Sequence, residues 1–198
     1  MRHVLGPGPE PAQTLDRGDI QMMLRSMVDA LAELSWPDGP DTWRQRPPWL
    51  IGIHHGGVAV AQELSDIIFL SEGFRPPMGT LDVTLYRDDA WLKAPRAAAG
   101  RTALPGDPSG QRILLVDDVL HTGRTVRAAL HELLDYGRPA AVKLAVLVDR
   151  QGRELPIDAE IVGQSVAMAA GESLRLTYDA DGRIDGASRW IGASKDER

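Results

Sequence analysis

The chain has 198 residues, of which 43% are hydrophobic and 25% are charged, and its formal net charge is −6. These proportions are ordinary for a globular protein, and the length suits one domain with a substantial core. The sequence has no cysteine, which excludes disulfides, thiolate metal sites and cysteine nucleophiles. The negative charge argues against broad non-specific binding to nucleic acid. No apolar run reaches membrane-spanning length and no signal-peptide core is present, so we expect a cytoplasmic protein without a membrane partner.

The N-terminal region begins with a stretch rich in proline and glycine. Apolar residues then recur at helical spacing from Ile20 to Leu34, with Asp16 or Asp19 as the expected N-cap. At the other end of the chain, the residues after Ile191 are small or charged and predict no regular structure. We therefore expect three parts: a flexible leader at residues 1–18, one folded domain at residues 19–191, and a disordered tail at residues 192–198.

A first strand, turn and helix unit is predicted near the middle of the N-terminal half. Residues 49–53 are apolar and predict a short buried strand, and a helical pattern begins at Val58. Backbone N–H groups at the start of a helix suit an anion, so the turn between them is a candidate anion site. The turn contains two histidines, but no third metal ligand is evident nearby, so we expect no direct metal site. The residues of this turn are His54, His55, Gly56 and Gly57.

The next part of the chain predicts a strand and a long loop. Residues 79–89 alternate apolar and polar side chains, which predicts a strand with one solvated face. Residues 90–112 are rich in alanine, proline and glycine and predict an irregular loop. A loop of this length inside a compact domain is usually functional or disordered.

Residues 113–125 are the most informative stretch of the chain. The stretch opens with four apolar residues, the pattern of a strand buried on both faces. Asp117 and Asp118 come where that strand is expected to end. A small polar turn follows, and the apolar spacing then becomes helical as far as Gly137. The unit is therefore a strand, an acidic pair, a glycine turn and a helix.

Each part of this unit has a chemical interpretation. Unpaired N–H groups at the turn and the helix N-terminus suit a phosphate, and Gly123 permits positive φ and close approach. A bound phosphate would repel paired carboxylates next to it. The carboxylates instead suit a neutral diol, because they can accept hydrogen bonds from its hydroxyls. A phosphate next to a cis-diol describes ribose 5-phosphate. The alternative is a buried strand that ends in a solvated acidic turn without a ligand.

This unit resembles the phosphoribosyl pyrophosphate (PRPP) motif of the type I phosphoribosyltransferases. In that family the acidic pair holds the ribose hydroxyls, the next loop holds the 5-phosphate, and Mg²⁺ accompanies the pyrophosphate. Receiver domains of response regulators also carry acidic residues after an apolar strand, but their pair lies near the domain start and no phosphate cradle follows. The resemblance implies a PRPP and nucleotide site made of Asp117, Asp118, Val119, Leu120, His121, Thr122, Gly123, Arg124 and Thr125.

Three segments narrow the resemblance to the PyrR family, whose members regulate the pyrimidine operon and have uracil phosphoribosyltransferase activity. They are residues 80–89, 116–134 and 145–162, the last with the pattern V-D-R-x-x-R-E-L-P-I. The resemblance implies an α/β fold with a central, mostly parallel sheet flanked by helices, and a small hood from the C-terminal strands or the N-terminal segment. Further strands are predicted at residues 161–166 and 173–178, and the turn signal at Asp181 predicts a C-terminal hairpin.

The same resemblance assigns substrates, partners and further site residues. It implies conversion of uracil and PRPP to UMP and diphosphate, a link to pyrimidine biosynthesis genes, and a homodimer or higher homo-oligomer. Arg87 joins Asp117 and Asp118 as a catalytic residue, and it faces pyrophosphate together with residues 54–57. The residues implied on the base side are Arg150, Ile161 and Val162.

Two features depart from the family pattern. PyrR proteins commonly have Arg-Thr-Arg-Gly in the pyrophosphate loop, whereas residues 54–57 are His-His-Gly-Gly, and the loss of two guanidinium groups weakens the grip on pyrophosphate. Attenuating members bind leader RNA through a basic, histidine-bearing face. Here Asp29, Gly152 and Asp158 stand where that face has histidines and an arginine, so we expect weak RNA binding. The alternatives are a non-enzymatic sensor of UMP or PRPP and a phosphoribosyltransferase for another base.

Overall fold

The computed structural model describes residues 14–37, 43–54, 56–83, 102–169 and 171–191. The predicted tail, residues 1–13 of the predicted leader and most of the predicted long loop lie outside these ranges. The elements in chain order are β1 (Thr14–Leu15), α1 (Arg17–Glu33), β2 (Trp49–Ile53), α2 (Gly56–Glu72), β3 (Met78–Leu81), β4 (Arg112–Leu120), α3 (Arg124–Tyr136), β5 (Ala141–Asp149), β6 (Ile161–Ser165), β7 (Glu172–Tyr178) and β8 (Ile184–Ile191).

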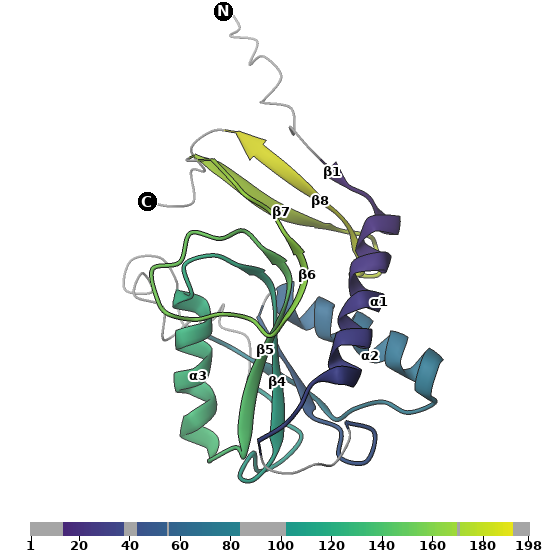
Figure 1. Ribbon diagram of the computed structural model, residues 1–198, viewed down its shortest axis with the longest axis vertical. Coiled ribbons are helices and arrows are strands. Elements are labelled where there is room, and N and C mark those ends of the chain that lie inside the picture. Colours follow the sequence, from purple (N-terminus) through teal and green to yellow (C-terminus); the bar gives the residue numbers. More distant parts are fainter. Residues whose placement is uncertain (1–13, 38–42, 55, 84–101, 170, 192–198) are drawn as a thin grey trace, which may run out of the picture.

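A five-stranded sheet forms the centre of the molecule, in the order β3-β2-β4-β5-β6, and all of its neighbouring pairs are parallel. Side chains of the strands alternate between two cores, as the strand period of two residues requires. On one face α1 and α2 cover Leu50, Leu114 and Leu147, and on the other face α3 covers Ile51 and Leu115 (Figure 1). The predicted α/β fold with a mostly parallel sheet is confirmed.

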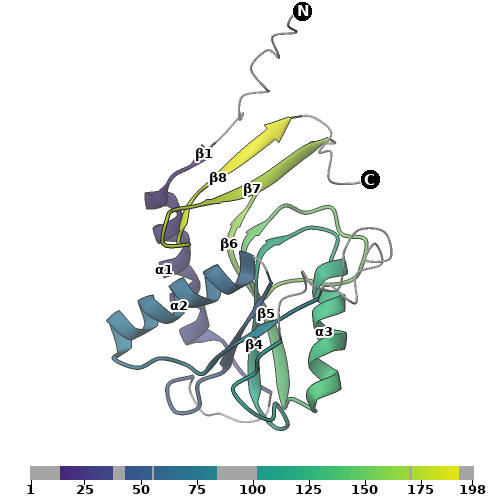
Figure 2. The ribbon, with the colours of Figure 1, turned by 180° about the vertical axis from the view of Figure 1, so that it is seen from behind.

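A smaller antiparallel sheet, in the order β1-β8-β7, forms the hood. The hood lies beyond the end of the central sheet at which α3 begins, and Figure 2 shows the same arrangement from behind. Both predicted sources contribute to it, since β1 comes from the N-terminal segment and β7 and β8 form the C-terminal hairpin. Since β1 and α1 begin before residue 19, the folded elements start earlier than the proposed boundary. The division into leader, domain and tail stays a prediction.

Helix α1 begins with a capping box that uses both of the predicted N-cap candidates. Asp16 is the N-cap and its carboxylate accepts from the amide of Asp19 at 2.9 Å, while the Asp19 carboxylate accepts from the amide of Asp16 at 3.0 Å. This reciprocal arrangement satisfies two backbone donors at the start of the helix. The apolar stripe predicted from Ile20 onward is buried against the central sheet.

Two strand boundaries differ from the prediction. β3 ends at Leu81, and Leu81, Asp82 and Val83 are all buried, so this part of the predicted strand has no solvated face. Residues 84–89 of that strand lie outside the described ranges. β4 does not end at the acidic pair but continues to Leu120, because β5 is long enough to pair with it as far as Asp149.

The first turn of α2 packs directly on the backbone of the central sheet. A Cβ atom added to Gly57 would lie 2.3 Å from the carbonyl oxygen of Val116 in β4, and one added to Gly52 would lie 2.6 Å from the Cα atom of Val58. Real Cβ atoms do not approach other atoms this closely. Glycine at these positions therefore allows α2 to lie against β2 and β4.

Replacing Gly57 with alanine should destabilise the fold by about 2–3 kcal/mol, because the clash is with backbone and cannot be relieved by a side-chain rotation. Urea unfolding followed by circular dichroism measures this change. Gly106→Ala is the matched control, since its added Cβ would lie 3.7 Å from the ring of Trp49, an ordinary contact. Equal midpoints for the two variants would contradict the packing described above.

Candidate active site

The acidic pair lies against the N-terminus of α2. A Cβ atom added to Gly56 would lie 2.0 Å from Oδ2 of Asp118, and one added to Gly57 would lie 2.9 Å from the Cα atom of Asp117. The two strand, turn and helix units predicted from the sequence therefore meet at one edge of the sheet. This edge is formed by the carboxyl ends of parallel strands, where ligands of open α/β sheets bind.

The backbone of β4 orients the two carboxylates. Asp117 is only 5% exposed, and its Oδ1 accepts from the amide of Asp118 at 3.0 Å. Asp118 is half-buried, and its Oδ1 accepts from the amide of Val119 at 2.8 Å. Because side chains alternate along a strand, Asp118 points to the side covered by α2 and Asp117 to the side covered by α3. The pair thus lies between the starts of two helices.

Helix α3 begins directly after the predicted phosphate turn. Gly123 is its N-cap residue and has φ 88°, in the left-handed region that the sequence led us to expect. Gly123 has no side chain to cap the helix, and the amide of Arg124 donates to Oγ1 of Thr122 at 3.3 Å. A helix start capped by glycine presents backbone N–H groups that suit an anion.

A loop at residues 150–157, directly after β5, supports this turn. Of its residues, only Arg150 was among the predicted site residues. The amides of Glu154 and Leu155 donate to the carbonyl oxygen of Thr122 at 3.0 and 3.1 Å. Arg124, on the other side, donates to the carboxylate of Glu154 at 2.7 Å. The loop therefore fixes the shape of the turn through both backbone and side-chain contacts.

Arg153 is the central residue of this supporting loop. Its guanidinium donates to Oδ2 of Asp149 at 2.7 Å, to the carbonyl oxygen of His121 at 2.9 Å and to that of Ile157 at 2.8 Å. It also lies 3.8 Å from the carboxylate of Asp158, which is 94% exposed. Spacing of four residues predicts a side-chain pair only on a helix, and residues 150–157 form a loop, so no local pattern indicated this contact.

The charge of Asp149 depends on these partners. Burial alone would raise the pKa of Asp149, but the hydrogen bond from Arg153, the amide of Gln151 and the charge of Arg153 together lower the pKa below its ordinary value. The backbone turns sharply here, since Gln151 has φ 58° and Gly152 has φ 78°. The ion pair therefore holds a tight turn whose first residue adopts a conformation that is unfavourable for a non-glycine residue.

The predicted base-side residues lie at different places. Arg150 follows β5 and donates through Nη2 to the carbonyl oxygen of Glu172 in the hood at 3.1 Å, and within the described residues its buried Nε has no partner. Ile161 is 2% exposed and packs in the core covered by α1 and α2. Val162 packs in the opposite core. The carboxyl end of β6 is formed by Gln164 and Ser165.

The predicted pyrophosphate residues are described only in part. His54 is half-buried and its amide donates to the carbonyl oxygen of Leu81 at 2.9 Å, while Gly56 and Gly57 begin α2. His55 and Arg87 lie outside the described residues. The roles assigned to all these residues stay predictions.

The hood contributes a residue that the sequence did not indicate. Burial, with the charges of Asp118 and Asp117, raises the pKa of Tyr178 to about 12. These charges act on Tyr178 across a long separation in the chain, since Tyr178 is the last residue of β7 in the hood. No local pattern could have revealed this, because Tyr178 and the acidic pair are distant in the sequence.

No group of three or more histidine and carboxylate side chains that could hold a metal ion occurs within the part of the chain that the structure describes. The two carboxylates of β4 nevertheless suit a hard cation that arrives with a phosphorylated substrate, because Mg²⁺ is commonly bound by one or two carboxylates plus substrate phosphates. Among the described helices, none is long and apolar enough to cross a membrane.

The fold and the arrangement of this site define a class of protein, the phosphoribosyltransferases. The sequence pattern of the family described as "Phosphoribosyl transferase domain" matches residues 26–173. Similar proteins named "Bifunctional protein PyrR" occur in Roseiflexus sp. (strain RS-1), 41% identical over 88% of this chain and 92% of the relative, and in Corynebacterium diphtheriae, 42% identical over 86% and 89%. The chain therefore belongs to the phosphoribosyltransferase domain family and, within it, to the PyrR family.

Solved structures agree on the fold. The hypoxanthine phosphoribosyltransferase of Trypanosoma cruzi superposes with a TM-score of 0.62 at 18% identity, covering 93% of this chain and 98% of that one. At this identity the likeness concerns the fold alone.

The lowered pKa of Asp149 predicts how the stability of the fold against unfolding changes at acidic pH. A carboxylate whose pKa is lower in the folded than in the unfolded state stabilises the fold above its unfolded pKa, and this contribution is lost as the pH falls below about 4. Asp149→Asn should therefore be less stable than the unmodified protein near neutral pH, with a smaller difference at about pH 3. Urea midpoints measured across this pH range test the prediction.

Asp158→Asn is the matched control for Asp149→Asn, because Asp158 pairs with the same guanidinium but is 94% exposed and 3.8 Å away. Exposed pairs contribute little, so this variant should follow the unmodified protein at every pH. The same pH dependence in both variants would contradict a specific contribution from Asp149.

Proposed function

We propose that this chain is a uracil phosphoribosyltransferase that converts uracil and PRPP to UMP and diphosphate, and that it is linked to the regulation of pyrimidine biosynthesis genes. One observation carries the proposal: the acidic pair of β4 lies between the glycine-capped start of α3 and the glycine start of α2. These are the three parts that a phosphate, a ribose diol and a pyrophosphate need side by side.

The proposed roles follow from the chemistry of each part. The 5-phosphate binds the N–H groups of the turn at Gly123, with its negative charge at the positive end of the α3 dipole. Asp117 and Asp118 accept hydrogen bonds from the ribose 2- and 3-hydroxyls. The pyrophosphate binds at the start of α2, where Gly56 and Gly57 expose backbone.

Catalysis in this scheme depends on positioning and on charge. The bond between the ribose and the pyrophosphate breaks as the base attacks, so the ribosyl group passes through a cationic state and the pyrophosphate gains charge. The carboxylates of β4 lie beside the ribosyl group and stabilise the developing positive charge. Mg²⁺, when bound with PRPP, supplies positive charge to the departing pyrophosphate. Holding both reactants in line supplies the remainder of the rate enhancement.

Replacing Asp117 and Asp118 together with asparagine should reduce PRPP-dependent formation of UMP at least about 100-fold, because loss of the charged acceptors misplaces the ribosyl group. A radiolabelled-uracil assay with PRPP and Mg²⁺ measures this, and circular dichroism checks the fold. Asp135→Asn, at an exposed position near the end of α3, is the control and should keep full activity. Near-normal turnover in the double variant would reject the proposed site.

The same assay distinguishes a uracil phosphoribosyltransferase from the two alternative functions. A panel of other nucleobases in place of uracil tests a phosphoribosyltransferase for another base. A sensor without enzymatic activity is favoured by the sequence at residues 54–57, which lacks the guanidinium groups common in the family. It would bind UMP or PRPP in calorimetry but release no diphosphate with any base.

RNA binding should be weak. Both arginines that remain on the proposed RNA face are engaged within the protein, Arg153 with Asp149 and two carbonyl oxygens and Arg150 with the hood. Asp29 and Asp158 are exposed and would repel phosphates. We expect little enhancement of binding by UMP.

Filter binding of the organism's own pyrimidine-leader RNA, measured against salt with and without UMP, tests this expectation. Few phosphate contacts give a shallow dependence of affinity on salt. Tight binding with a steep salt slope would contradict it, and Arg25→Ala, at an exposed position of α1, would then test whether that helix supplies the contacts.

We further propose that the protein acts in the cytoplasm as a homodimer or higher oligomer. Sedimentation of the purified chain tests the oligomeric state.

A further inference from the structure

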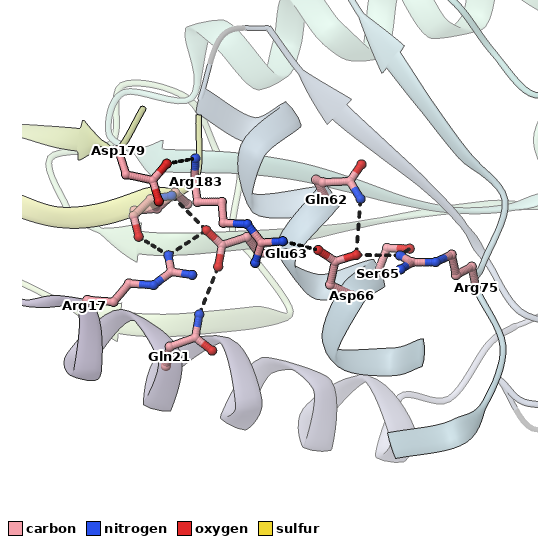
Figure 3. Close-up of polar contacts among 10 residues, drawn as sticks. Arg17, Gln21, Gln62, Glu63, Ser65, Asp66, Arg75, Asp179 and Arg183 are labelled. Atoms are coloured by element: carbon pink, nitrogen blue, oxygen red, sulfur yellow. Dashed lines mark hydrogen bonds and ion pairs between the residues drawn. The ribbon is translucent and has the colours of Figure 1, made fainter. Parts of the chain in front are cut away.

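A buried charge requires hydrogen-bonding partners, and Glu63 of α2 shows how completely the chain can supply them. Glu63 is 3% exposed. Its carboxylate accepts from Nη1 of Arg17 at 2.8 Å, from Nε2 of Gln21 at 3.0 Å and from the amide of Ile184 at 2.8 Å (Figure 3). This group joins α1 and the hood to α2, and its charge is satisfied within the protein.

The charge of Lys143 is not matched in this way. Lys143 is the third residue of β5, and its side chain is only 17% exposed. Its Nζ lies 3.8 Å from Oε1 of Glu160, which is an ion-pair distance but too long for a hydrogen bond. Among the described residues, Nζ has no hydrogen-bond acceptor. A largely buried ammonium whose donors are unused suits an anionic group of a ligand.

Lys143 lines a cavity at the end of the central sheet where β4 and β5 begin, opposite to the acidic pair. The volume of the cavity is about 410 Å³, which lies in the range of small-molecule sites. Its walls are residues 35–37 after α1, residues 141–143 at the start of β5, and Glu160 before β6. Figure 1 shows the chain after α1 running to this end of the sheet. The cavity is therefore separate from the candidate active site.

Trp36 forms the aromatic wall of the cavity. It is 6% exposed, and both Nζ of Lys143 and the guanidinium of Arg112 lie 5.8 Å from the centre of its ring. Its indole Nε1 is buried and has no hydrogen-bond partner within the described residues. Buried donors without acceptors are rare in proteins. This wall therefore retains hydrogen-bonding capacity that the chain itself does not use.

The opposite charge in the cavity comes from Glu160 and from the end of α1. Oε2 of Glu160 accepts from the amide of Leu144 at 2.9 Å, which orients the carboxylate, while Oε1 is the atom that lies near Lys143. Helix α1 ends at Glu33, two residues before Ser35 in the cavity wall, and its last turn contains no basic residue. The carbonyl groups at a helix C-terminus favour a cation. The cavity thus suits a positive ligand group next to a negative one.

We propose that this cavity is a second ligand site, which binds a small zwitterion of the α-amino acid class. The ligand carboxylate pairs with Nζ of Lys143, and the ligand ammonium pairs with Oε1 of Glu160. These two protein atoms are 3.8 Å apart, and an α-amino acid carries its two charged groups at adjacent positions, so both pairs can form together. The apolar part of the ligand packs on Val142 and Pro37. A phosphate fits less well, because the Glu160 carboxylate repels a doubly charged anion.

Titration of the ¹⁵N-labelled full chain with L-leucine tests the site, with the indole N–H resonance of Trp36 as the signal. Trp36→Phe identifies this resonance among those of the five tryptophans. Leucine should shift the resonance and saturate in the millimolar range, and saturating UMP should not displace it. No shift with leucine up to about 20 mM would overturn the proposal. Displacement by UMP would also overturn it, because the signal would then come from the candidate active site.

Two analogues of leucine test the charge pairing without any variant. Isocaproate lacks the ammonium of leucine, and isoamylamine lacks its carboxylate. Each analogue should bind about 10-fold more weakly than leucine, which is the effect of losing one charge-assisted hydrogen bond. Equal binding of all three probes would overturn the assignment of a zwitterion.

Variants of the two charged residues should separate the analogues. Lys143→Met removes the ammonium and should weaken leucine and isocaproate binding about 10-fold without weakening isoamylamine binding. Glu160→Gln should weaken leucine and isoamylamine binding instead. Arg25→Met, at an exposed position of α1, is the control and should bind all three probes normally. Equal losses for all three probes in Lys143→Met would indicate a disturbed fold in place of a lost charge pair and would overturn the role of Lys143.

Discussion

The close approach of α2 to β4 is the contact on which the rest of the site depends. Gly56 and Gly57 bring the first turn of the helix against the backbone of Val116 and beside the carboxylates of β4. A larger side chain at either position would separate the helix from the strand and move its N–H groups away from the acidic pair. The same helix carries Glu63 on its next turns, so its position also determines where the hood lies.

The opposite side of the site is held by a different kind of support. There, the side chains of Leu155 and Ile157 lie next to Gly123, and the turn keeps its shape because residues 150–157 donate hydrogen bonds to it. Part of the V-D-R-x-x-R-E-L-P-I segment thus supports the turn at Gly123. Its arginine at 153 donates to Asp149 and to two carbonyl oxygens, so this guanidinium holds the loop together.

Local patterns predicted the fold well. The buried strands, the N-cap of α1 at Asp16, the end of α3 at Gly137 and the hairpin at Asp181 all follow from spacing and turn chemistry that lie within a few residues of each other. The predicted end of β4 was wrong, because the true end depends on the length of the neighbouring strand β5. Tyr178, Glu63 and the role of residues 150–157 were likewise beyond prediction, because each depends on partners that are distant in the chain.

The pairing of β1 with β8 has a consequence for how the molecule is assembled. Thr14 and Leu15 bond to Ser188 and Ala187, so one edge of the hood cannot form until nearly the whole chain has left the ribosome. The central sheet uses only residues 49–165 and can begin to fold earlier during synthesis. Contacts between such distant positions close a long loop of chain and form slowly. The pairing of β1 with β8 is therefore formed only after all strands of the central sheet have been synthesised.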